Sequence, residues 1–210
     1  MHGVALTLAW VVTAQAPGSP PRPPAALEAV AAKMRTLISL QVDMRQEKEM
    51  AIFGETLRSR GTLVLARPRR LAMDLDGAGG STLVIDGDRM AMHYKALDKT
   101  ERFDLTKDPR AKAIADHLFL LLDADAAGLQ ETYALEVAAT EPLQITLTPK
   151  PEALRRIIAQ VTLRFDRNHF VDKLIIQEAG GDRTIWWFDD PVVDRPIDPE
   201  RFSLARLPAQ

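Results

Sequence analysis

The 210-residue chain contains no cysteine. Disulfide bonds are therefore excluded. The absence does not identify the compartment, because both cytosolic proteins and exported proteins can be built without disulfides. It has one firmer consequence. Bacterial lipid anchors are attached to a cysteine, so we expect this chain, if it is exported, to be released as a soluble protein.

A large excess of positive charge is also missing. The chain has 27 lysines and arginines against 29 aspartates and glutamates, which gives a formal net charge of -2. Nucleic-acid-binding proteins concentrate positive charge on one face, so we expect no nucleic-acid partner. The densest basic runs are short and typical of solvated surfaces. They are Arg67, Arg69 and Arg70, and Arg155 and Arg156.

Motifs for catalysis and metal binding are absent as well. There is no glycine-rich phosphate-binding loop and no GxSxG element. The segment that begins at Asp123 matches a calcium loop only in part, because Ala127 and Ala134 occupy two ligand positions. The histidines lack the paired spacing of metal ligands; they are His2, His93, His117 and His169. We therefore expect a protein that is not an enzyme and binds no metal or cofactor.

Residues 3–16 form an uncharged stretch of small and apolar residues that ends in Ala14, Gln15 and Ala16. An A-x-A ending is typical of a cleaved export signal, although no lysine or arginine precedes this apolar run. The run is too short to span a bilayer, which needs about 20 residues. We predict a signal peptide over residues 1–16; the alternative is a disordered or extended start.

Proline content and helical periodicity define the next part of the chain. Residues 17–24 contain five prolines and predict an unpacked linker, so we expect a single folded domain over residues 25–210. Apolar residues recur at helical spacing over residues 25–40 and 109–122, which predicts two amphipathic helices. Pro109 suits the first turn of the second helix.

The remaining segments alternate or run apolar between turn residues, which predicts strands. The predicted strands are 41–53, 61–67, 70–76, 82–86, 89–96, 100–105, 132–139, 142–149, 157–166, 169–178 and 182–189, with 201–205 as a short further candidate. About eleven antiparallel strands form a sandwich or curl toward a barrel, and we favour curling. Many of these strands are apolar on both faces, so the sheet needs a second cover or a ligand. The two helices are the candidates for that cover.

An ordered set of segments resembles the family of periplasmic outer-membrane lipoprotein carrier proteins (LolA-like). The set begins with the amphipathic helix and the strand residues Met44, Arg45 and Gln46. It continues with RGTLVLARP (60–68), LVIDGDRMAMHY (83–94), LQITLTP (143–149) and EAGGDRTIWWF (178–188). Together the segments span roughly residues 26–205.

The resemblance implies a mainly β fold, an unclosed antiparallel β-barrel whose opening is covered by helices that act as a lid over an apolar cavity. It also implies a function as a soluble carrier in the periplasm. Such proteins take acylated lipoproteins from an inner-membrane exporter, shield their lipid tails, and pass them to an acceptor at the outer membrane. We expect a monomer with these partners.

Arg67 matches the family's arginine on the strand before Pro68. Strand alternation places it on the same face as Leu63 and Leu65, where a charged group needs hydrogen-bond acceptors. The resemblance implies that backbone carbonyls of the lid, here residues 109–125, supply them and that Arg67 latches the empty cavity closed. Alternatively, this side chain reaches solvent or pairs with Asp74 or another surface acid.

The cargo-binding face predicted from strand parity and the resemblance combines apolar side chains with this arginine. It comprises Met44, Leu63, Leu65, Arg67, Leu71, Met73, Met90, Met92, Leu118, Leu121 and Trp187. Trp186 and Trp187 alternate faces, so only one of the two can line the cavity.

The family often has aromatic residues at the positions of Met44 and Leu71. Because methionine adapts to irregular ligands, these departures indicate a softer cavity or a different lipid, unless the residues serve only the core. A carrier of another amphiphile and a lipoprotein-sensing regulator of the same fold remain open alternatives.

Overall fold

The computed structural model describes residues 25–209. The predicted signal peptide (residues 1–16) and proline-rich linker (17–24) lie outside the described residues. In the described part of the chain, no helix combines the length and the apolar character that crossing a bilayer requires.

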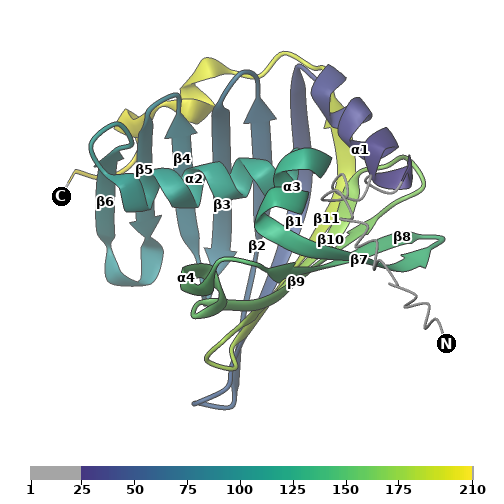
Figure 1. Ribbon diagram of the computed structural model, residues 1–210. Helices are drawn as coiled ribbons and strands as arrows, with labels where there is room; N and C mark the ends of the chain where they lie inside the picture. The colour runs from purple at the N-terminus through teal and green to yellow at the C-terminus, as the bar shows by residue number, and fades with distance from the viewer. Residues whose placement is uncertain (1–24, 210) are drawn as a thin grey trace, which may run out of the picture.

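Within residues 25–209, eleven antiparallel strands form one sheet (Figure 1). The first six are β1 (Ser39–Met50), β2 (Glu55–Ala66), β3 (Arg70–Gly77), β4 (Ser81–Asp86), β5 (Arg89–Tyr94) and β6 (Lys99–Asp104). The other five are β7 (Tyr133–Thr140), β8 (Leu143–Pro149), β9 (Ile158–Phe165), β10 (Val171–Glu178) and β11 (Arg183–Val193). The short 3-10 helix η1 (Lys95–Leu97) joins β5 to β6.

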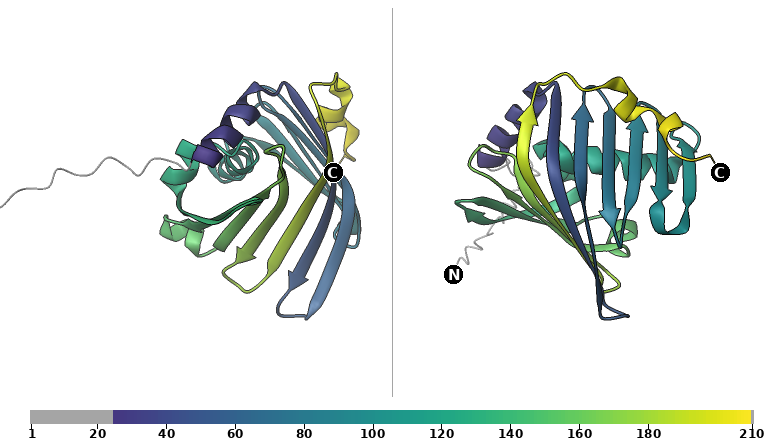
Figure 2. Two further views of the ribbon diagram at one scale, coloured as in Figure 1. Left: turned by 90° about the vertical axis from the view of Figure 1, so that its right-hand side faces the viewer. Right: turned by 180° about the vertical axis from the view of Figure 1, so that it is seen from behind.

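The sheet curls but does not close. Its order is β6-β5-β4-β3-β2-β1-β11-β10-β9-β8-β7, so β1 pairs with β11 and the two edges, β6 and β7, are not paired with each other. Figure 2 shows the sheet curving around the helices. The predicted fold class, an unclosed antiparallel sheet of about eleven strands with helices over its opening, is confirmed.

Gly61 permits a close approach between β2 and β3. A Cβ atom at this position would lie 1.7 Å from the carbonyl oxygen of Asp74, far inside van der Waals contact. Glycine has no Cβ and therefore fits where other residues do not. The glycine of the segment RGTLVLARP thus has a structural explanation.

Four α-helices occur among the described residues: α1 (Ala25–Thr36), α2 (Pro109–Leu122), α3 (Ala126–Thr132) and α4 (Glu152–Arg155). The first three lie on the concave side of the sheet, which we call the inner face, and α2 crosses in front of the strands from β6 toward β1 (Figures 1 and 2). Asp108 caps α2 by accepting hydrogen bonds from the amides of Arg110 (3.0 Å) and Ala111 (2.9 Å). Pro109 occupies the first turn of α2, as predicted.

Strand alternation gives the sheet a second apolar layer on its convex side, the outer face. Leu63 and Leu65 of β2 belong to the main core on the inner face. Val64, between them in sequence, packs with Phe202 on the outer face, where Leu207 covers β4 and β5. The outer face is therefore apolar over β2–β5, where the C-terminal segment covers it.

The cover of the outer face is the C-terminal segment, which contains the 3-10 helices η2 (Pro199–Phe202) and η3 (Leu204–Arg206). In the rear view of Figure 2, where the outer face is turned to the viewer, it crosses in front of the upper ends of the strands. One prediction was wrong here: residues 201–205 form no strand, because most of them belong to η2 and η3. The predicted helices cover the inner face, and the second cover is this C-terminal segment. Asp198 caps η2 through the amide of Glu200, and Pro199 follows it, so the local sequence favours a tight turn.

Candidate functional site

Apolar side chains fill the space between the inner face and α1–α3, and most of the residues predicted to bind cargo meet there. Six of them are buried in one cluster: Met44, Leu63, Leu65, Leu71, Met90 and Leu121. Three more are partly buried against the same cluster: Met73, Met92 and Leu118. The strands and α2 thus bring nine of the eleven predicted residues to one face.

Trp187 is an exception, because it lies on the outer face. It pairs across the strands with Arg45, whereas the neighbouring pair of Met44 and Phe188 belongs to the inner core. Side chains alternate along a strand, so Trp186 takes the inner position. The prediction that Trp187 lines the cavity was therefore wrong. The run IWWF is apolar at every position, and its hydrophobicity could not decide between the two tryptophans.

An apolar pocket of about 30 Å³ remains beneath α1 and the end of α2. This volume holds roughly one or two water molecules. The pocket is lined by Met34, Leu40, Val42, Leu63, Leu122, Phe170, Val171 and Phe188. A long acyl chain does not fit into it, so the helices must move before a lipid can enter this space.

Arg67 is bonded to both helices that border this pocket. Its Nη1 and Nη2 donate to the two carboxylate oxygens of Asp123 (3.0 and 2.8 Å), and Nη2 also donates to the backbone carbonyl of Met34 (2.9 Å). The expectation that lid carbonyls hold this arginine is corrected, because the main acceptor is a carboxylate and the one carbonyl comes from α1. Asp74, the alternative partner, lies on the outer face and bonds to Arg206.

Asp123 stands at the C-terminal end of α2, where the helix dipole disfavours a negative charge. The bidentate contact with Arg67 offsets this cost, since charge-assisted paired hydrogen bonds are among the stronger contacts in proteins. Nε of Arg67 is nevertheless buried without a hydrogen-bond partner among the described residues. The contact therefore combines strong hydrogen bonds with two unfavourable contributions, the helix dipole at Asp123 and the unpaired Nε of Arg67. The free energy needed to break it is thus smaller than the number of hydrogen bonds suggests.

A second ion pair ties the same turn to α2. Arg69, two residues after Arg67, contacts Asp116 (2.5 Å) and lies over the ring of Phe119, with its guanidinium carbon 5.1 Å from the ring centre. Burial alone would raise the pKa of Asp116, but hydrogen bonds from Lys112 and Arg69 lower it. Asp116 and Asp123 are seven residues apart, two turns of helix, and so face the same side of α2. That spacing is the sequence signal that could have identified both tethers.

His117 connects α2 to the start of β7. Its Nε2 lies 2.7 Å from the hydroxyl of Tyr133. Burial lowers the pKa of His117 and raises the pKa of Tyr133 to about 12. At neutral pH the ring is therefore uncharged and the hydroxyl protonated, which suits a hydrogen bond from Tyr133 to the ring nitrogen.

Residues 35–205 match the model of one protein family, described as the outer membrane lipoprotein carrier protein LolA. The chain belongs to the LolA family. The matched segment includes both residues of the Arg67 and Asp123 pair and every strand of the sheet. The resemblance inferred from the ordered segments is thereby confirmed.

Individual relatives of this LolA family member are distant. An outer-membrane lipoprotein carrier protein of Chromohalobacter salexigens is 27% identical over 203 residues, which cover 96% of this chain and 90% of the relative. A solved structure of a DUF1329 family protein from Desulfovibrio piger covers 88% of this chain and 98% of its own, with 11% identity and a TM-score of 0.49. The solved structure of a LolA superfamily protein from Nitrosomonas europaea covers 87% of this chain and 98% of its own, with 12% identity and a TM-score of 0.45.

The helical periodicity over residues 109–122 did not identify which side of α2 is buried. The side chain of Phe119 is buried, whereas that of Ile114 on the same helix is 57% exposed. The buried side of α2 contains Ala111, Ala115 and Phe119, which are spaced four residues apart. This pattern was hard to recognise in the sequence, because two of its three members are small alanines and helical periodicity is usually read from large apolar residues.

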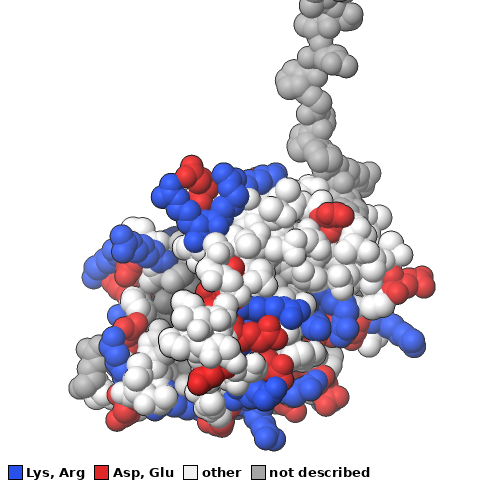
Figure 3. Space-filling view, turned by 90° about the horizontal axis from the view of Figure 1, so that it is seen from below, with Lys and Arg blue, Asp and Glu red and all other residues white. Residues whose placement is uncertain are grey.

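The lower face of this LolA family member, as oriented in Figure 1, carries charges of both signs. On that face, Lys and Arg side chains lie interspersed with Asp and Glu side chains (Figure 3). This face therefore carries no broad field of one sign, which a surface that tracks nucleic-acid phosphates would need.

Proposed function

We propose that this LolA family protein is a soluble periplasmic carrier that shields the acyl chains of lipoproteins between its sheet and helices α1–α3. The observation that carries the proposal is an apolar inner face covered by helices, two of which, α1 and α2, are tied by one arginine, Arg67. The name of the relative from C. salexigens, an outer-membrane lipoprotein carrier protein, agrees with it.

The need for such a carrier follows from the hydrophobic effect. Burial of one methylene is worth about 0.8 kcal/mol, so a single long acyl chain amounts to roughly 10 kcal/mol. A carrier must offer apolar contacts on a similar scale. In the closed state α1–α3 occupy that surface, so lipid binding exchanges helix contacts for lipid contacts. The net free energy of the exchange is then much smaller than the gross burial.

Arg67 shifts the equilibrium between the closed, empty state and the lipid-bound state. Its bonds to Asp123 and Met34 exist only while α1 and α2 lie in place, so they favour the closed, empty state. A lipid that displaces the helices must break these bonds, and re-forming them favours release. The sequence has no nucleotide-binding motif, so loading and release depend on such a small free-energy difference between the two states.

The proposed donor is an inner-membrane lipoprotein exporter, and the proposed acceptor is a protein at the outer membrane. The carrier is proposed to act as a monomer between them. No catalytic step on the cargo is included in this cycle.

Analysis of the bound cargo tests the proposal. The protein is purified from its native periplasm, and the extracted material is identified by mass spectrometry. Acylated peptides or lipoproteins are the expected finding. Free lipids, or the absence of any acylated species, would overturn the proposal.

A carrier of a different amphiphile is the second candidate, and one observation favours it. Met44, Met73, Met90 and Met92 all lie on the inner face, where their flexible thioethers adapt to irregular ligands. Recovery of one glycolipid or other free amphiphile in the same mass-spectrometric experiment is the result that this candidate predicts.

A further inference from the structure

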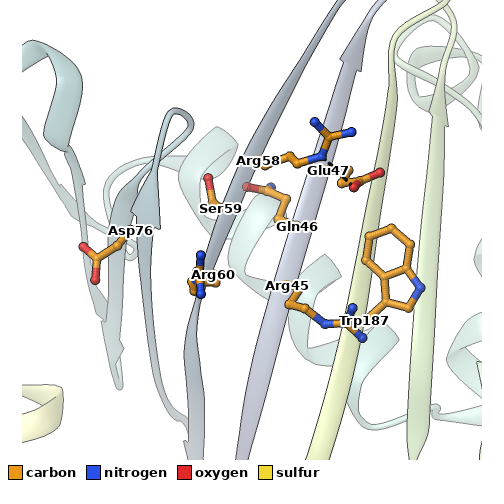
Figure 4. A pocket seen from close by; sticks show the side chains of 8 residues that line it. All are labelled: Arg45, Gln46, Glu47, Arg58, Ser59, Arg60, Asp76 and Trp187. Atoms are coloured by element: carbon orange, nitrogen blue, oxygen red, sulfur yellow. Dashed lines mark hydrogen bonds and ion pairs between the residues drawn. The ribbon is translucent and has the colours of Figure 1, made fainter.

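A row of basic side chains crosses the outer face, away from the helices and the cargo space. The strand registers place five residues opposite one another on adjacent strands: Arg164 of β9, Lys173 of β10, Trp187 of β11, Arg45 of β1 and Arg60 of β2. Figure 4 shows three of them, Arg45, Arg60 and Trp187, along one side of the sheet. We call these five residues the basic row.

Like charges stand directly opposite each other at two places in the basic row. Lys173 faces Arg164, and Arg45 faces Arg60. Such cross-strand pairs destabilise a sheet, so local stability does not explain them. Residues that break a local rule without a structural gain are expected at functional sites.

Nearby acids neutralise only part of the row. Arg164 pairs with Asp172 (2.8 Å) and Arg45 with Asp189 (3.0 Å). Among the described residues, neither Lys173 nor Arg60 forms an ion pair. These two unpaired cations contrast with the formal net charge of -2 of the whole chain.

The acids beside the row are also engaged elsewhere. Glu47 pairs with Arg58 (2.9 Å), as the dashed line in Figure 4 shows, and Asp76 pairs with Lys95 (2.5 Å). Neither acid is therefore left to neutralise Arg60, although Asp76 lies opposite it on β3. Arg60 and Lys173 therefore have no direct ion-pair partner among the described residues.

A groove of about 480 Å³ runs along this part of the outer face. It is lined by Arg45, Gln46, Glu47, Arg58, Ser59, Arg60, Asp76 and Trp187. Two cations lie close to the ring of Trp187. Lys173 Nζ is 5.4 Å from the ring centre, and the guanidinium carbon of Arg45 is 5.6 Å from it, so the aromatic ring lies between them. The C-terminal segment crosses the other end of the outer face (Figure 2), and the side chains of Arg45 and Arg60 are exposed while those of Trp187 and Lys173 are partly exposed.

We propose that this groove binds an acidic, extended segment of a partner protein. Adjacent strands are about 4.8 Å apart, so the two unpaired cations, three strands apart, are separated by about 14 Å. An extended chain covers this span in about four residues, with the first, third and fifth side chains on one side. The matching segment therefore carries acids at positions one and five and an apolar residue at position three, which packs on Trp187.

A protein segment fits these observations better than a membrane surface. Three residues of the basic row line the groove, namely Arg45, Arg60 and Trp187, and Trp187 is partly buried, so this part of the outer face offers no projecting apolar side chain to a bilayer. A narrow chain can enter the groove beside Arg60 and extend past Trp187 to Lys173, which lies outside the groove lining but next to the Trp187 ring. The proposed contact is separate from the cargo space, because the two lie on opposite faces of the sheet.

A designed peptide tests the proposal on the full chain. The probe is a capped seven-residue peptide with glutamates at positions two and six, leucine at position four, serines between them and glycine at each end. Binding is followed by the NMR shift of the Trp187 indole and by titration calorimetry at low and at high salt. We expect saturable binding that weakens with salt.

Variants locate the site. Arg60→Glu and Lys173→Glu should each weaken binding about three- to fivefold, and the double variant more strongly. Arg167→Glu, which reverses an exposed cation in the turn between β9 and β10, is the matched control and should bind the peptide as the wild type does. Cargo binding should be unchanged in all four variants, so failure here is distinguishable from failure of the carrier proposal.

Three outcomes would overturn the inference. The first is equal binding of a peptide with the same composition but adjacent glutamates, since this would remove the spacing requirement. The second is equal loss of affinity in Arg167→Glu, which would indicate unspecific attraction. The third is binding to vesicles that contain phosphatidylglycerol, lost in the double variant, with no binding of the peptide, which would assign the row to a membrane.

Discussion

Arg67 connects the sheet to two helices at once, because Asp123 ends α2 and Met34 belongs to α1. Replacement by leucine removes all of these bonds. We predict that Arg67→Leu retains cargo more tightly and releases it at least about tenfold more slowly, since a hydrogen bond from a charged donor is worth about 1.5–3 kcal/mol. The measurement is the rate at which a fluorescent acylated peptide moves from the carrier to phospholipid vesicles.

Matched variants separate the latch from general charge effects. Arg67→Lys keeps the charge but cannot make the bidentate contact, so its release rate should lie between those of wild type and Arg67→Leu. Asp123→Asn should slow release as well, and combining it with Arg67→Leu should add little, because both changes break the same contact. Equal release rates for wild type and Arg67→Leu would rule out the latch.

His117 makes the closed structure sensitive to pH. Its pKa is lowered by burial from the ordinary value of 6.5, so the folded protein binds fewer protons than the unfolded chain in the range just below pH 6.5. Stability should therefore be constant above about pH 7.5 and fall as the pH drops from 6.5 toward the lowered pKa. Thermal unfolding at pH 7.5 and pH 5.5 measures this fall.

The substitution His117→Gln provides the control for that pH dependence. It removes the titrating ring but keeps a group that can bond to the hydroxyl of Tyr133. The difference between the two melting temperatures should shrink in this variant. If it stays as large as in the wild type, other groups carry the pH dependence.

At the residue scale, the sequence predicted which face a side chain occupies better than what it touches. Alternation along β2 correctly placed Arg67 on the side of Leu63 and Leu65, because the strand is regular there. The partner Asp123 comes from a segment 56 residues away, and no local rule brings the two together. Trp187 was assigned to the wrong face because alternation shows only which residues share a face. A polar residue is needed to tell the solvent side from the core side, and the run IWWF contains none.

The helix α2 is the element that covers most of the inner face, and Phe119 is its largest buried side chain. We predict that Phe119→Ala lowers stability by about 3 kcal/mol, because truncating a buried aromatic leaves a cavity. In a domain of this size the melting temperature should drop by about 6–12 °C. Uptake of a fluorescent fatty-acid probe should also increase, since the lid is held less firmly.

Ile114→Ala is the matched control on the same helix, because this side chain is mostly exposed. Its effect should stay within about 0.5 kcal/mol. An equal loss of stability in both variants would mean that the packing of α2 onto the sheet does not depend on its buried side.

At the element scale, most strands and the two long helices were predictable, and the two short helices were not. The helix over residues 109–122 has the predicted limits, since Asp108 and Pro109 mark its start in the sequence as well as in the structure. The helices α3 and α4 have seven and four residues, too few for a periodic pattern to emerge. Strand β2 begins six residues before its predicted start, because charged residues in its first half hide the alternation.

At the scale of the whole molecule, one sheet separates two apolar layers with different covers. Helices tied by ion pairs cover the inner face, and the C-terminal segment covers the outer one over β2–β5. Composition alone indicated that a second cover was needed but could not identify it. Because the two covers are separate segments, a displacement of α1–α3 would leave the apolar part of the outer face covered.

Arg206 holds the C-terminal segment to the sheet by its bond to Asp74 (2.8 Å). Burial alone would raise the pKa of Asp74, but hydrogen bonds from Thr82 and Arg206 lower it below the ordinary 3.8. We predict that Arg206→Ala costs about 1 kcal/mol at pH 7, or about 2–4 °C in melting temperature. Because the pKa of Asp74 is depressed, this contribution exists above pH 3.8 and is lost as the pH falls through the lowered value.

Chemical denaturation of wild type and Arg206→Ala at pH 7 and at pH 2.5 measures both parts of this prediction. The stability difference should be present at pH 7 and smaller at pH 2.5, because Asp74 takes up a proton as the pH falls through its lowered pKa. Asp74→Asn should reproduce the loss and make the Arg206→Ala difference independent of pH. A difference of equal size at both values would show that Arg206 acts through packing instead, and that the outer cover is held by its apolar contacts, chiefly Phe202 and Leu207.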